Sequence, residues 1–64
     1  MARQTKEDKR IDAAADAAFY KHGNQIQFNI MDLGKIHNAG VVAGKAGKDI
    51  EAAVIEAIAK YRQN

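Results

Sequence analysis

The feature that most constrains this chain is a short run, residues 24–30, in which polar and apolar side chains alternate. Its members are Gln25, Ile26, Gln27, Phe28, Asn29 and Ile30. A period of two is typical of a strand with one buried and one polar face. Because a lone strand leaves its backbone groups unpaired, it needs a partner, and the chain contains no second such run. The sequence therefore predicts a strand at 25–30 that pairs with the same strand of a second copy.

The length of 64 residues indicates a single domain, 1–64, that is marginally stable alone, since a chain of this size buries only ~60% of its unfolded surface. There is no cysteine, so disulfides and thiolate zinc sites are excluded, which leaves a homodimer as the expected support. No apolar run reaches the ~20 residues that a membrane helix needs, and the N-terminus lacks the apolar core of a signal peptide. We expect a cytoplasmic protein without membrane contact.

Helical periodicity surrounds the predicted strand, so the fold class is mainly α. A first helix is predicted at 5–22, with Thr5 as its cap, Asp8 in the capping-box position and Gly23 as its stop. Further helices are predicted at 32–46, capped by Asp32, and at 49–62. Within the second helix, Gly40 and Gly44 share one face, where they would let another backbone approach closely.

The order of strand, helix, glycine break and helix over residues 25–62 resembles the ribbon-helix-helix family of dimeric repressors, of the Arc and Mnt type. The resemblance is carried by the triplet Gln27-Phe28-Asn29 followed by Ile30, by a helix ending near Gly47, and by an amphipathic helix ending in Tyr61. In that family two strands form an antiparallel ribbon that enters the major groove of DNA. The resemblance implies sequence-specific binding of duplex DNA and a small transcriptional regulator or repressor.

The same resemblance implies roles for individual residues. The expected base readers are Gln25, Gln27 and Asn29, since Gln and Asn side chains pair well with adenine. Phosphate contacts are expected at the amino end of the last helix and at nearby lysines; these residues are Lys45, Lys48, Asp49 and Ile50. The expected core of the dimer consists of Ile26, Phe28, Ile30, Val54 and Ile58.

A small three-helix bundle that binds another protein, and not DNA, is the main alternative. In this interpretation residues 26–30 form an extended connection or an extra helical turn, and the apolar faces make a dimer or a partner site. The first helix is also a candidate surface for a protein partner. A helix-turn-helix across residues 32–58 ranks lower, because Ile36 would stand where a small residue is usual.

Enzymatic activity is not expected. The chain has no serine or cysteine, and its single threonine, Thr5, is a predicted helix cap, so a hydroxyl or thiol nucleophile is missing. His22 reads as a helix-end residue and His37 as a solvent-facing one, and neither belongs to a cluster with metal-ligand spacing. The sequence therefore predicts no metal, no cofactor and no small-molecule substrate.

Overall fold

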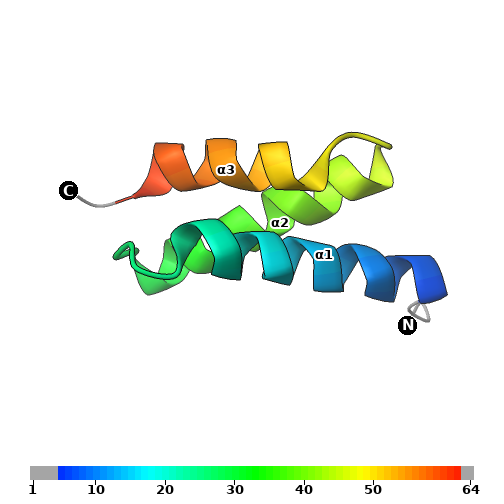
Figure 1. Ribbon diagram of the computed structural model, residues 1–64, viewed down its shortest axis with the longest axis horizontal. Coiled ribbons are helices and arrows are strands. Elements are labelled where there is room, and N and C mark those ends of the chain that lie inside the picture. Colours follow the sequence, from blue (N-terminus) through cyan, green and yellow to red (C-terminus); the bar gives the residue numbers. More distant parts are fainter. Residues whose placement is uncertain (1–4, 63–64) are drawn as a thin grey trace.

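A computed structural model describes residues 5–62, which form three helices. These are α1 (Lys6–Gly23), α2 (Ile30–Lys45) and α3 (Ile50–Tyr61). Each helix packs against both of the others, in a body measuring 37 × 24 × 16 Å (Figure 1). The mainly helical prediction is confirmed, and the arrangement is that of a small helical bundle.

The strand predicted at 25–30 is wrong: no strand occurs among residues 5–62. Residues 24–29 connect α1 to α2, beginning with a turn in which the Ile26 N–H donates to the Gly23 carbonyl at 3.1 Å. Ile26 and Phe28 pack against the core, whereas the polar residues between them are exposed. A connection with two apolar side chains packed against a helical core thus produces the same alternation as a strand. The intermolecular ribbon has no counterpart in this fold, and the homodimer stays a prediction.

The N-terminal cap of α1 agrees with the sequence prediction. Thr5 Oγ1 accepts a hydrogen bond from the Asp8 N–H at 3.1 Å, and the Asp8 carboxylate accepts from the Thr5 N–H at 3.2 Å. This reciprocal capping box satisfies two donors that a helix N-terminus otherwise leaves unpaired. The helix ends at Gly23, one residue beyond the predicted end.

The helix α2 begins earlier than predicted, at Ile30, so Asp32 lies in its first turn and Asn29 occupies the N-cap position. At its other end, the Lys48 N–H donates to the Ala43 carbonyl at 2.8 Å and the Gly47 N–H to the Gly44 carbonyl at 3.1 Å. Together with the φ of 76° at Gly47, this is a Schellman motif, which requires a left-handed residue at that position. The motif reverses the chain into α3.

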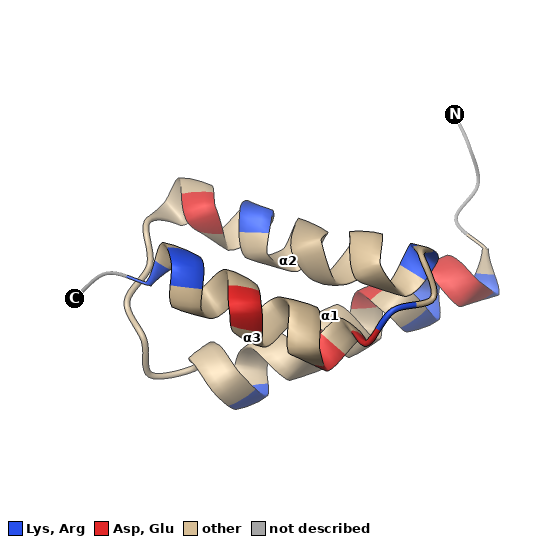
Figure 2. Ribbon diagram, turned by 90° about the horizontal axis from the view of Figure 1, so that it is seen from above, with Lys and Arg blue, Asp and Glu red and all other residues tan. Residues whose placement is uncertain are grey.

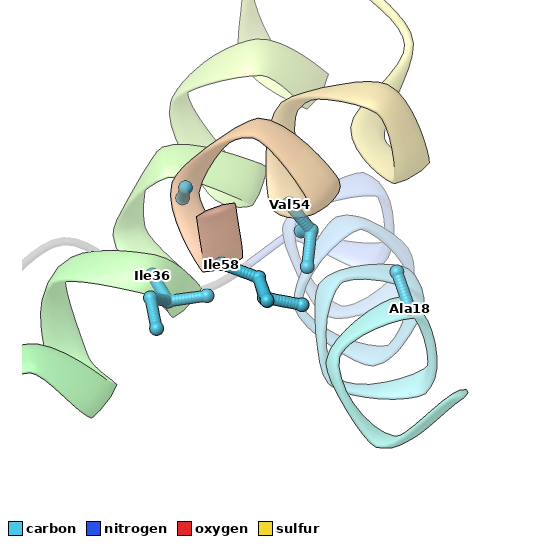
Figure 3. Packing of buried hydrophobic residues seen from close by; sticks show 5 residues of the cluster. Ala18, Ile36, Val54 and Ile58 are labelled. Carbon is cyan, nitrogen blue, oxygen red and sulfur yellow. The ribbon is translucent and has the colours of Figure 1, made fainter. Parts of the chain in front are cut away.

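All three helices contribute to the apolar core. The cluster consists of Ala18, Ile36, Val54, Ala57 and Ile58, with side chains that converge between the helices (Figure 3). Val54 and Ile58 were predicted as core residues, and they are buried within the single chain. Ile30, predicted for the core of a dimer, is 84% exposed in the single chain as the first residue of α2, so its burial in a dimer stays a prediction.

Gly40 and Gly44 let the neighbouring helices approach α2 closely, as their spacing indicates. A Cβ atom on Gly40 would lie 2.9 Å from the Ala15 Cβ atom of α1, and one on Gly44 would lie 2.7 Å from Ile11 Cγ2. The two glycines therefore account for the tight contact between α2 and α1.

Candidate functional site

A groove of about 610 Å³ runs between α2 and α3. The α2 side and the following turn supply Lys35, Asn38, Ala39, Val42, Ala43, Ala46 and Lys48. The α3 side supplies Ala53, Glu56, Ala57, Lys60 and Tyr61. Five of these twelve residues are alanines, whose side chains are too short to fill the space between two packed helices. Val42, on the groove wall, is 55% exposed, so an apolar surface faces solvent.

The positive charge of the chain is concentrated in this groove. The chain has ten basic and eight acidic residues. Three of the basic residues, all lysines, and one of the acidic residues, a glutamate, line the groove. Seven basic and seven acidic residues are left for the rest of the chain, which is therefore neutral overall. In Figure 2 the middle of α2 carries no charged residue, while a red and a blue band lie near its beginning and a blue band at its end.

Tyr61 joins the two lysines at one end of the groove. Lys35 Nζ lies 5.7 Å and Lys60 Nζ 5.4 Å from the centroid of its ring. Both distances are in the range of cation–π attraction. Lys35 Nζ also lies 3.7 Å from Asp32 Oδ1, one helical turn earlier. The tyrosine ring thus gathers two positive charges beside an apolar floor.

The predicted base readers do not belong to this groove. Gln25, Gln27 and Asn29 are exposed on the connection between α1 and α2, Gln25 within the turn after α1 and the other two beyond it. Ile26 and Phe28 fix that segment to the core, and Phe28 contacts the Phe19 ring at a centroid distance of 5.6 Å. The three residues predicted to read bases are therefore accessible to solvent, and base reading stays a prediction.

The groups predicted to bind phosphate are largely engaged in other contacts. Asp49 caps α3, since its Oδ1 accepts from the Glu51 N–H at 3.0 Å and the Ala52 N–H at 3.4 Å. This carboxylate occupies the place where a helix N-terminus would hold an anion. The Lys48 amide is bonded to Ala43, and Ile50 is partly buried against the core. Lys45 lies exposed in the last turn of α2, outside the groove lining, so phosphate binding stays a prediction.

Both histidines form contacts between helices, which the sequence did not reveal. His37 of α2 meets two carboxylates of α1: its Nε2 lies 2.9 Å from Asp12 Oδ1 and its Nδ1 lies 3.0 Å from Asp16 Oδ1. His37 is therefore a partly buried tether and not the solvent-facing residue that was predicted. The signal available in the sequence was the spacing of Asp12 and Asp16, which puts two carboxylates on one side of a helix.

His22, at the end of α1, makes the corresponding contact with α3. Its Nε2 lies 2.9 Å from Glu51 Oε1, and Lys21 Nζ lies 3.9 Å from the same oxygen. Within residues 5–62, no group of three or more histidines and carboxylates is arranged to hold a metal ion. The histidines thus link α1 to the other two helices.

Comparison with family models, with curated proteins and with solved structures finds no match. In the described part of the chain, no helix combines the length and the apolar character needed to cross a membrane. The site is therefore interpreted from its own chemistry.

Proposed function

We propose that this chain is a small protein-binding module whose groove between α2 and α3 takes a helix from another protein. The observation that carries the proposal is the apolar, alanine-lined floor of the groove, which is left open to solvent. An amphipathic helix laid into a groove between two helices is a recurring mode of peptide recognition. Its apolar side chains would fill the space that the alanines leave and remove that surface from water.

The dimensions of the groove favour a helix. At ~1.5 Å of rise per residue, the stretch of α2 from Lys35 to Ala46 is ~16 Å long, which matches about three helical turns of a partner. The floor is made of small residues, so a partner helix can lie close to both α2 and α3. The lining combines apolar residues with the polar residues Lys35, Asn38, Lys48, Glu56 and Lys60, a mixture that protein interfaces also contain.

Sequence-specific binding of duplex DNA stays a prediction, as do the homodimer and the absence of enzymatic activity. DNA binding draws support from the lysines of the groove, but the structure offers it only a single polar segment at 24–29. A protein-binding groove would cover the exposed side chain of Val42 and the alanines that line the groove beside it. A titration of duplex DNA at increasing salt separates the two functions, because binding to phosphates weakens steeply with salt.

The proposal is tested by selecting binders from a displayed library of amphipathic helical peptides and mapping the best one by NMR. We expect backbone amide shifts to move along α2 and α3 on the groove side. Ala53→Leu, which fills the groove, should abolish binding. Ala52→Leu is the matched control, since Ala52 is exposed on the same helical turn and does not line the groove.

A peptide that binds both variants equally, or that shifts only resonances of the outer face of α1, would contradict groove binding. Circular dichroism of both variants checks that each is folded. Salt-sensitive binding of duplex DNA that is lost in Gln27→Ala and Asn29→Ala would favour the DNA-binding function instead.

A further inference from the structure

The groove has a charge pattern that restricts the partner it can take. Lys48 lies at one end, where the Schellman turn leads into α3. Lys35 and Lys60 lie at the other end, each with its ammonium group within 6 Å of the centroid of the Tyr61 ring. Alanines and Val42 line the floor and wall between these two ends. A partner helix would therefore pass over an apolar floor bounded by positive charge at both ends.

Glu56 is the single acidic residue of the groove lining, and it comes from the middle of α3. A negative charge at that point disfavours an acid on the middle of a partner and favours a neutral or basic residue. The lysines thus favour acidic residues at the two ends of the partner, and Glu56 favours a neutral or basic residue at its middle. This pattern distinguishes the groove from a uniformly basic surface, which would suit any polyanion.

Resting on the proposed function, we infer that the partner is an amphipathic helix with acidic residues at both ends of its apolar stripe. The spacing of its acids follows from the groove, since ~16 Å of helix corresponds to about eleven residues. The acid at the Tyr61 end meets Lys60 and the neighbouring Lys35, whose ammonium group also lies 3.7 Å from Asp32 Oδ1. The acid at the opposite end meets Lys48.

Three synthetic helical peptides of about 20 residues test the inference, a length at which an isolated helix begins to be stable in water. They share one leucine stripe and differ only at the two end positions, which carry Glu, Gln or Lys. The readout is fluorescence anisotropy at low and high salt. We expect the Glu peptide to bind about tenfold more tightly than the Gln peptide, the Lys peptide to bind least, and the differences to shrink in high salt.

A charge swap assigns the effect to the groove. In the triple variant Lys35→Glu, Lys48→Glu, Lys60→Glu the preference should reverse, so that the Lys peptide binds best. Lys45→Glu is the matched control, because Lys45 is exposed on α2 and does not line the groove. It should leave the order of the three peptides unchanged.

The outcomes distinguish a wrong charge preference of the partner from the absence of helix binding in the groove. If all three peptides bind equally and Ala53→Leu blocks them, a helix docks in the groove but the charge inference is wrong. If none of the peptides binds and the library yields no binder that Ala53→Leu blocks, both the inference and the proposed function are wrong. If single-stranded or duplex nucleic acid binds through Lys35, Lys48 and Lys60 while the peptides do not, the groove serves a polyanion, which also overturns the inference.

Discussion

Gly40 of α2 and Val54 of α3 lie so close that a Cβ atom on the glycine would come within 2.7 Å of Val54 Cγ2. Val54 is fully buried, so it has no free space into which to move. Gly40→Ala should therefore lower the free energy of unfolding by about 1–3 kcal/mol, because the overpacking outweighs the gain in helix propensity. Urea denaturation followed by circular dichroism measures the change.

Gly34 provides the control in the same helix. No heavy atom lies within 4 Å of a Cβ atom added there. Gly34→Ala should raise the free energy of unfolding by about 0.5–1 kcal/mol, since alanine is the better helix former and restricts the unfolded chain. A destabilised Gly34→Ala together with an unaffected Gly40→Ala would contradict the packing of α2 described above.

Two isoleucines of α2 differ in burial, and their substitution tests which face of this helix is packed against the core. Ile36 is fully buried, whereas Ile30 is 84% exposed. We expect Ile36→Ala to cost about 2–5 kcal/mol of unfolding free energy and Ile30→Ala to stay within about 0.5 kcal/mol of the parent. A large cost at Ile30 in a thermal or urea melt would indicate that this residue is buried in solution, as the ribbon dimer predicted.

The cap of α3 depends on the Asp49 carboxylate, which accepts from the Glu51 and Ala52 amides. Asp49→Ala should lower the free energy of unfolding by about 0.5–2 kcal/mol, because the amides lose their side-chain acceptor. Asp49→Asn should recover most of the loss, since asparagine caps helices nearly as well. Equal losses for the two variants, measured by chemical denaturation, would mean that the side-chain hydrogen bonds of the cap do not contribute to the free energy of unfolding.

His37 and Asp16 form a contact between α2 and α1 that is largely open to water, with Asp16 78% exposed. A double-mutant cycle using His37→Ala and Asp16→Ala should give a coupling free energy of about 0.2–1 kcal/mol at low salt, and less at 1 M salt. The cycle requires denaturation curves of the two single variants and the double variant. A coupling above that range would mean that solvent screens the pair less than its exposure indicates.

The helices were predictable because each has its own local signal. The capping box at Thr5 and Asp8 and the glycine stop at Gly23 gave α1 within one residue at each end. The spacing of Val54 and Ile58 identified core positions of α3. Such signals act within a few residues of sequence, so they can be interpreted without knowing what packs against them.

The connection at 24–29 and the groove were not predictable in this way. Ile26 and Phe28 alternate with polar residues because the segment crosses an apolar core, a contact that only the assembled bundle reveals. The groove likewise depends on bringing Lys35 next to Lys60 and Tyr61, which lie far apart in the sequence. The partly open position of the groove between α2 and α3 is likewise a property of the packing.

The core cluster, with members from every helix, determines how the chain folds. Ala18 is supplied by the first helix, Ile36 by the second, and Val54 and Ile58 by the last. Any two helices without the third would leave buried side chains of the cluster in water, so a partly assembled pair has little free energy to hold it together. We therefore expect the bundle to form and melt as one cooperative unit, in a single transition between the folded and unfolded chain.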